Sequence, residues 1–306
     1  MNTQKIDIAE LLNPAEKRKV YKDQTMEWGE LIIPGENAHS EKNHEGLRVL
    51  FIGSASPGLL VMESLKKYEL KYPDRINLRA LVTDMPTCIK ARISCEKRIW
   101  RFSSVGEKQN LFDDIKESAL SFGIPCYSGA IKCDFFRQLL YAWNPEIIIM
   151  CCFGQLVDDI IFNYPAYGMY NIHPSDLAES IGIGTQPIEH TIKMGFSTTK
   201  VTFHQVNEIM DGGSIIGKSP LINIKLSNDA YPEKMLTLYE KVCSISGWMT
   251  LDLIQAVLDK RSRGEKGSLD CVDFEKCIPD DIKKLLLAPA TCDGDKYTLP
   301  LHGSLT

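Results

Sequence analysis

Short apolar runs alternate with stretches of helical periodicity from residue 47 onward. The first run, Leu47–Gly53, ends in a Gly-Ser turn, and apolar residues at helical spacing follow it, with Pro57 near the helix start. Further strands and helices alternate along the chain at 76–82, 111–122, 124–127, 134–143 and 146–153. Strands that alternate with helices predict an α/β fold built on a mainly parallel, doubly wound sheet.

A second group of elements follows residue 153. Its strand-like segments are at 169–173, 200–206 and 214–218, its helix is at 186–194, and a turn-rich loop occupies 174–185. A long amphipathic helix is predicted from Pro232 to Asp259, which could pack on the sheet or build a homodimer.

The polar, acidic N-terminal stretch differs from the rest of the chain and has one helix-like segment, at 15–22. We therefore predict three parts. These are an N-terminal arm at 1–46, a central α/β domain at 47–225, and a C-terminal helical extension with a short tail at 226–306.

Composition and charge exclude several classes of protein. The 306 residues are 44% hydrophobic and 25% charged, which is typical of a folded globular chain. The net charge of −5 disfavours a globally basic nucleic-acid binder. Without a secretory signal or an apolar stretch of membrane-spanning length, the chain is expected to be cytoplasmic and to make no membrane contact. The ten cysteines contain no C-x-x-C and predict free thiols rather than a metal site.

Ligands of such sheets bind at the carboxyl ends of the strands, so the residues after Gly53, Val82 and Phe153 are expected to line the site. The turn at 53–58 is neither a G-x-G-x-x-G loop nor a Walker loop. A nicotinamide or ATP site is therefore disfavoured.

The most informative polar residues are Asn171, His173 and Asp211. An amide, an imidazole and a carboxylate on strand-end loops can together run acyl transfer to an amine. The amide N–H can hold a developing oxyanion, the imidazole can polarise a carbonyl or move a proton, and the carboxylate can orient the imidazole. A purely structural role for a single histidine at such a turn remains open.

At these residues the chain resembles the folate-dependent formyltransferases, which include glycinamide ribonucleotide, methionyl-tRNA and sugar N-formyltransferases. The likeness runs in order through PEIII and FGQLV at 145–157, NIHPS at 171–175 and VTFHQVNEIMDGGSII at 201–216. It implies that 47–225 form a Rossmann-like formyltransferase domain, which moves a formyl group from 10-formyltetrahydrofolate to an acceptor amine.

The resemblance also implies individual roles. Asn171 would hold the carbonyl oxygen, His173 would polarise the formyl group and help proton transfer, and Asp211 would orient a water or the histidine and relay the amine's proton. The folate would lie between two loops that contribute Phe153, Gly154, Gln155, Leu156, Val157, Val206, Asn207, Ile209 and Met210.

The acceptor side departs from the family pattern. The loop at 178–185 lacks the usual proline and Arg-Gly, and the chain after Gly264 is too short for the second domain of methionyl-tRNA enzymes. The segment 85–110 is rich in Lys and Arg, with Trp100 and Phe102 among them, which suits a phosphate or nucleotide. We therefore expect a small-molecule amine acceptor, such as a nucleotide-linked amino sugar, and disfavour tRNA.

Three alternatives remain at this stage. They are a methionyl-tRNA formyltransferase-like enzyme, a formyltetrahydrofolate hydrolase that uses the same three residues, and a non-catalytic folate-binding protein. His190, on a predicted helix, and His204, in a predicted strand, are weaker candidates for ligand contact. No metal cluster is predicted.

Overall fold

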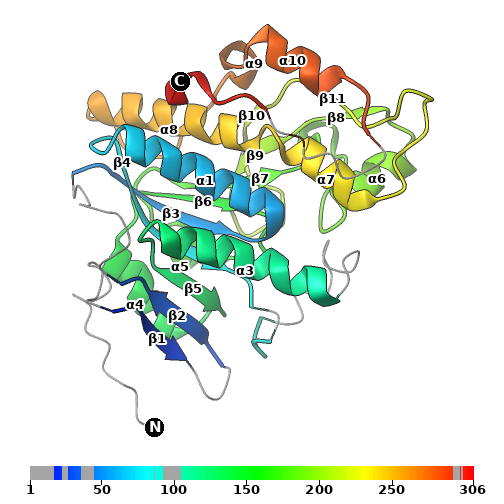
Figure 1. Cartoon of the computed structure of the whole chain (residues 1–306). Coiled ribbons are helices and arrows are strands. Elements are labelled where there is room, and N and C mark those ends of the chain that lie inside the picture. The colour runs from blue at the N-terminus through cyan, green and yellow to red at the C-terminus, as the bar shows by residue number, and fades with distance from the viewer. Residues whose placement is uncertain are drawn as a thin grey trace.

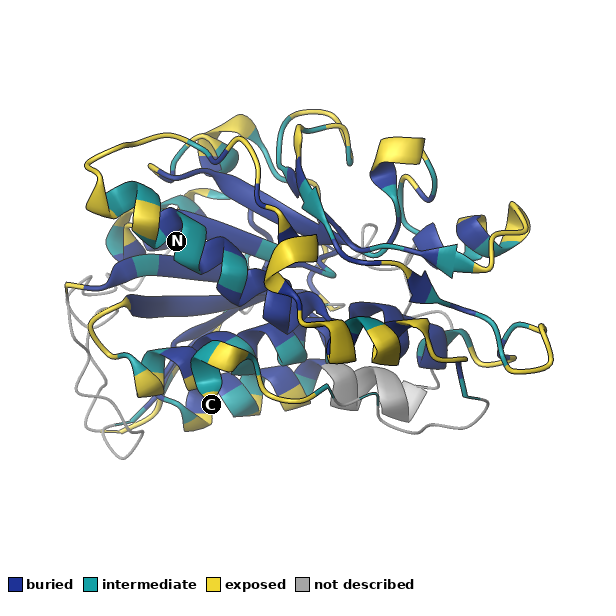
Figure 2. Ribbon diagram, turned by 90° about the horizontal axis from the view of Figure 1, so that it is seen from above, coloured by how far each residue is buried: buried dark blue, intermediate teal, exposed yellow. Residues whose placement is uncertain are grey.

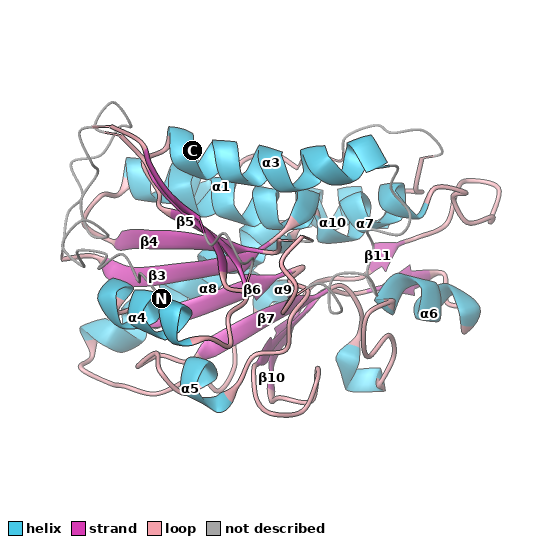
Figure 3. Cartoon of the chain, turned by 90° about the horizontal axis from the view of Figure 1, so that it is seen from below, coloured by secondary structure: helices cyan, strands magenta, loops and turns pink. Residues whose placement is uncertain are grey.

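The computed structural model describes residues 17–22, 27–35, 45–85, 87–91, 105–291, 297 and 299–306, with the side chains of 105–111 left out. These residues form one large sheet with helices on both of its faces (Figure 1, Figure 3). The structure is a mixed α/β fold with a mostly parallel central sheet, as the sequence predicts.

The large sheet has nine strands in the order β1-β2-β5-β4-β3-β6-β7-β9-β10. Its central strands, from β5 to β7, pair in parallel, and the strands at either side pair antiparallel. The strands are β1 (Lys19–Lys22), β2 (Gly29–Ile33), β3 (Leu47–Gly53), β4 (Ile76–Thr83), β5 (Cys126–Gly129), β6 (Ile147–Cys151), β7 (Met169–His173), β9 (Thr202–Gln205) and β10 (Ile215–Lys218). A small separate sheet pairs β8 (Thr198–Thr199) with β11 (Ile222–Asn223).

Two hydrophobic cores cover the two faces of the large sheet. One contains apolar residues of α1 (Ala55–Lys71), α3 (Val105–Ser121), α7 (Met235–Cys243) and α8 (Ser246–Ser262). The other contains residues of α4 (Asp134–Trp143) and α5 (Asp159–Phe162). The remaining helices are α6 (Pro187–Lys193), α9 (Phe274–Cys277), α10 (Asp280–Leu287) and the short 3-10 turns η3 (Leu177–Glu179) and η4 (Gly303–Leu305).

Burial on both faces explains the near-continuous apolar runs of the central strands. Every residue of β4 is buried, and so is nearly every residue of β3 and β6. Figure 2 shows the buried strands at the centre, with exposed residues in loops and on the outer turns of helices. Because β4 and β6 lie on opposite sides of β3, their following loops meet at one edge of the sheet.

The predicted N-terminal arm contributes two strands to the sheet. The helix predicted at 15–22 is wrong, because Lys19–Lys22 form β1, which pairs with β2. Strand β2 in turn pairs with β5, and its Leu31 and Ile33 are fully buried in the same core as α4. Burial of these side chains against the sheet, rather than local helix propensity, decides the conformation of this segment. The division of the chain into three parts, with boundaries after residues 46 and 225, stays a prediction.

The helix predicted from Pro232 to Asp259 is instead two helices, α7 and α8. The break falls at Ser244, whose side chain donates a hydrogen bond to the Lys241 carbonyl at 2.7 Å, while its backbone N–H turns to the same oxygen at 3.2 Å. Both helices contribute buried residues to the core over the sheet, and Gly247 lets α8 approach Ser64 of α1 closely. The predicted homodimer through this segment stays untested.

No helix in the described ranges combines the length and the apolar character needed to cross a bilayer.

Strand β2 is predicted to contribute to the stability of the whole sheet. Ile33→Ala should lower the free energy of unfolding by about 3 kcal/mol, because it leaves a cavity in the core. Val20→Ala in the neighbouring strand is the matched control, since Val20 is 53% exposed, and should change it by less than about 0.5 kcal/mol. Urea denaturation checks both values, and equal effects would contradict the burial of β2.

Candidate active site

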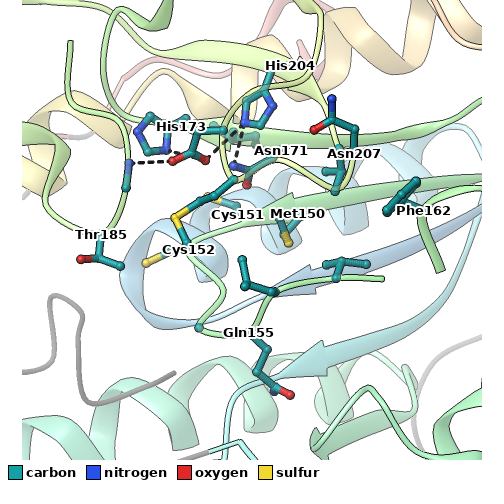
Figure 4. Close-up of a pocket in the computed structure, with 18 of the residues that line it drawn as sticks. Met150, Cys151, Cys152, Gln155, Phe162, Asn171, His173, Thr185, His204 and Asn207 are labelled. Carbon is teal, nitrogen blue, oxygen red and sulfur yellow. Dashed lines mark hydrogen bonds and ion pairs between the residues drawn. The ribbon is translucent and has the colours of Figure 1, made fainter. Parts of the chain in front are cut away.

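A cavity of about 870 Å³ opens at the carboxyl ends of β6 and β7 (Figure 4). Its walls come from the loop that follows β6, from the end of β7, from the loop before α6, and from the loop between β9 and β10. Helix α7 adds Tyr239 and Cys243. Asn171, His173 and Asp211 all line this cavity, so the fold brings together three residues that are up to 40 positions apart in sequence.

Asn171 is held by a histidine on the neighbouring strand. Strands β7 and β9 pair so that Asn171 lies opposite His204, and the Asn171 Nδ2 is 3.0 Å from the His204 Nε2. The His204 Nδ1 lies 2.8 Å from the Gln205 carbonyl, which can only accept, so Nδ1 carries the proton and Nε2 accepts from the Asn171 amide. His204 therefore determines which way the Asn171 amide faces.

His173 sits at the end of β7 between a backbone carbonyl and a carboxylate. Its Nε2 donates to the Gly182 carbonyl at 2.7 Å, and its Nδ1 is 3.5 Å from the Asp211 Oδ1. The proton on Nε2 leaves Nδ1 facing the carboxylate. The ring is thus oriented with one nitrogen toward Asp211, in the arrangement that proton transfer requires.

Asp211 is positioned by its backbone as well as by its neighbours. Its φ of 53° is in the left-handed region, which aspartate tolerates better than most residues. Its Oδ2 accepts from the Gly184 N–H at 2.8 Å, and the Oδ1 lies 3.7 Å from the His204 Nε2. The carboxylate is therefore within reach of both imidazoles.

Burial is the main influence on His204. Loss of hydration disfavours its charged form and holds its pKa below the ordinary value of 6.5; the charge of His173 acts in the same direction, and the Gln205 carbonyl and Asp211 oppose it. A neutral His204 keeps its Nε2 lone pair for Asn171.

Most residues predicted to contact the folate line the cavity. They are Gly154, Gln155, Leu156, Val157, Val206, Asn207, Ile209 and Met210. Phe153 does not line it, because its side chain is buried in the core beneath α4. The Gln155 side chain is anchored away from the cavity centre, donating to the Gly129 carbonyl at 2.8 Å and accepting from the Ile131 N–H at 3.2 Å. A role in folate contact stays a prediction for all nine residues.

The residues after Gly53 and Val82 form a layer behind the cavity rather than its wall. The buried Asp84 carboxylate accepts from the Gly154 N–H at 2.7 Å and from the Ser54 hydroxyl at 3.1 Å. Of the segment 53–58 that follows β3, Pro57, at the start of α1, lines the cavity. Sequence reasoning pointed to these strand ends but did not single out Asp84, whose signal was a charged residue directly after an apolar strand.

His204 and the backbone of Gly182 and Gly184 are the other groups that sequence reasoning undervalued. A histidine in a buried strand beside the site was a visible signal, whereas the backbone contacts depend on how the loop folds. The basic segment at 85–110 lies largely outside the described residues. Within the described part of the chain, no group of three or more His, Cys, Asp or Glu residues could hold a metal ion.

The lowered pKa of His204 predicts acid sensitivity. Below pH 6.5 the unfolded chain binds a proton at this residue while the folded state resists it, so the free energy of unfolding should fall as the pH decreases. His204→Gln keeps an acceptor for Asn171 but cannot bind that proton, and its stability should fall less between pH 6.5 and pH 5. Urea denaturation across this range is the measurement, and identical slopes for the two proteins would contradict the assignment.

Residues 129–243 match the Formyl transferase family. The chain is 34% identical over 87 residues to methionyl-tRNA formyltransferase of Ehrlichia chaffeensis, which covers 28% of each chain. It is 28% identical over 158 residues to that of Wolbachia pipientis subsp. Culex pipiens, covering 52% of this chain and 48% of the relative. The chain thus spans about half, or less, of the length of these relatives.

Two solved structures share the fold. Glycinamide ribonucleotide transformylase 1 from Geobacillus kaustophilus is 18% identical with a TM-score of 0.50, covering 69% of this chain and 99% of that one. A formyltetrahydrofolate deformylase from Pseudomonas syringae pv. tomato is 15% identical with a TM-score of 0.51, covering 71% and 63%. The segment that matches the Formyl transferase family contains Asn171, His173 and Asp211.

Proposed function

We propose that this protein transfers a formyl group from 10-formyltetrahydrofolate to the amine of an acceptor. The observation that carries the proposal is that Asn171, His173 and Asp211 line one cavity. The His173 Nδ1 is 3.5 Å from the Asp211 Oδ1, and Asn171 is hydrogen-bonded to His204, whose Nε2 is 3.7 Å from the same carboxylate oxygen. This arrangement suits attack of an amine on a carbonyl carbon.

The cavity fits a folate in size and in character. Its volume of about 870 Å³ suits a ligand with a fused ring system and an aromatic linker. Three exposed apolar side chains line it, where they can cover flat rings: Leu156, Ile209 and Met210. When bound, 10-formyltetrahydrofolate supplies the formyl group on a nitrogen that departs as an amine.

Asn171 is proposed to hold the oxygen of the reacting carbonyl. Its amide has two N–H groups, and the bond to His204 takes one of them, so the other can donate to a second oxygen. Negative charge develops on that oxygen when the amine attacks, and a preoriented donor stabilises it. His204 contributes by preventing rotation of the amide.

His173 and Asp211 are proposed to move the proton that the attacking amine releases. With Nε2 bound to Gly182, the Nδ1 of His173 is the nitrogen next to the carboxylate and can accept a proton there. Asp211 stabilises the resulting imidazolium, since its Oδ1 is 3.5 Å away. The same proton is then available to the departing nitrogen, so the transfer needs no net proton.

The expectation of a small acceptor, with tRNA disfavoured, is wrong. The two relatives described above are named methionyl-tRNA formyltransferases, which favours tRNA as the partner. We therefore propose the amine of a methionyl-tRNA as the acceptor. The short chain and the unusual 178–185 loop, which led to the earlier expectation, do not outweigh that likeness.

Loss of the proton-transfer pair should abolish most turnover. His173→Ala and Asp211→Asn are each expected to lower kcat by at least about 100-fold, the scale of losing a proton-transfer or oxyanion group. Asp229→Asn, an exposed carboxylate paired with Lys225, is the control and should keep full activity. Circular dichroism checks folding, and normal activity in both site variants would refute the proposed roles.

The acceptor is identified by following tetrahydrofolate release from 10-formyltetrahydrofolate with and without added amines. Methionyl-tRNA should stimulate release and become formylated, while uncharged tRNA should not. Stimulation by nucleotide-linked amino sugars instead would overturn the tRNA proposal. Release that is independent of any acceptor would identify a hydrolase, and folate binding without release would identify a silent binding protein.

A further inference from the structure

The loop at 180–185 contacts both members of the His173–Asp211 pair. Three of its residues, Ser180, Gly182 and Gly184, have left-handed backbone conformations, with φ values of 55°, 70° and 96°. In these conformations the backbone of the loop faces the pair: the Gly182 carbonyl accepts from His173, and the Gly184 N–H donates to Asp211. One loop thus holds both members of the pair through its main chain.

Gly182 is the point at which this loop is most tightly packed. A side chain there would place its Cβ 2.7 Å from the Ser175 Cβ and 2.8 Å from the Pro187 carbonyl, closer than such atoms approach one another. The Gly182 N–H donates to the His190 Nδ1 at 2.8 Å. The two sides of Gly182 therefore bind two different imidazoles, His190 through its N–H and His173 through its carbonyl.

The direction of these hydrogen bonds determines which nitrogen carries the proton in each of the two imidazole rings. A backbone N–H only donates, so the His190 Nδ1 accepts and its proton is on Nε2. A carbonyl only accepts, so the His173 Nε2 carries a proton and its Nδ1 faces Asp211. If the Gly182 carbonyl moved away, the His173 ring would lose the contact that selects this tautomer.

We propose that His190 is a positioning residue for His173. It lies on α6, is exposed to solvent and is not part of the cavity lining, so it acts through Gly182 rather than on a bound molecule. By accepting from the Gly182 N–H, it fixes the loop so that the Gly182 carbonyl meets the His173 ring. The effect on catalysis rests on the proposed function, whereas the effect on the His173 tautomer does not.

Two substitutions separate this role from a general effect on α6. His190→Asn retains an acceptor, because the Asn Oδ1 occupies a place similar to that of Nδ1, and His190→Leu has none. Lys193→Ala changes an exposed residue of the same helix and is the matched control. Since positions 190 and 193 are exposed, the variants should fold.

The first measurement is the ¹⁵N chemical shift of the His173 ring nitrogens in histidine-labelled protein, assigned by comparison with His173→Ala. Wild type, His190→Asn and Lys193→Ala should show one protonated Nε2, and His190→Leu should show an averaged or altered pattern. Because this readout needs no turnover, it tests the positioning role even if the proposed reaction is wrong. An unchanged His173 pattern in His190→Leu would overturn the proposal.

The second measurement is steady-state kinetics of formyl transfer. His190→Leu should lower kcat by about 10-fold or more, as expected when a reacting group is displaced, with KM for the folate changed less than about 2-fold because its loops are elsewhere. His190→Asn should recover most of kcat. Equal losses in the Asn and Leu variants, or a loss confined to KM, would overturn the positioning role.

Discussion

The buried carboxylate of Asp84 ties together the loops on which the cavity is built. It accepts from the Ser54 hydroxyl after β3 and from the Gly154 N–H after β6, while its own position at the end of β4 is set by parallel pairing with β3. A buried carboxylate is tolerated only where its oxygens are hydrogen-bonded, so these loops have little freedom to separate. Gly154 is required there because a Cβ would come within 2.9 Å of the Asp84 Oδ1. The layer of residues behind the cavity is thus held in place by the hydrogen bonds that the Asp84 carboxylate accepts.

In the cavity wall, directional hydrogen bonds arrange the reacting groups. Asn171 and His204 face each other because β7 and β9 are antiparallel and in register at this pair. His173 and Asp211 meet across the loop whose backbone contacts both of them. In each case an acceptor that cannot donate decides the protonation of an imidazole nitrogen, so backbone carbonyls determine the chemistry of side chains.

The central fold followed from local patterns. The apolar run at 47–53 is β3 at the predicted bounds, and α4 likewise occupies the predicted 134–143, because apolar spacing and burial agree there. The pattern of apolar positions predicted the wrong element where contacts with segments distant in sequence decide the conformation. Residues 19–22 form a strand because β2, which is itself paired with β5, offers them an edge to extend. The helix predicted over 232–259 breaks where the Ser244 hydroxyl donates to the carbonyl of Lys241.

The sequence by itself determined the alternation of strands and helices at the centre of the fold, the family resemblance and the residue types available for acyl transfer, since these depend on spacing and side-chain chemistry. It also pointed to Asn171, His173 and Asp211 without their partners. Only the tertiary structure decided that His204 orients Asn171, that Phe153 faces the core, and that Gly182 connects His173 to His190. Strand register and loop winding bring these groups together from positions distant in sequence, and no local pattern encodes a hydrogen bond between them.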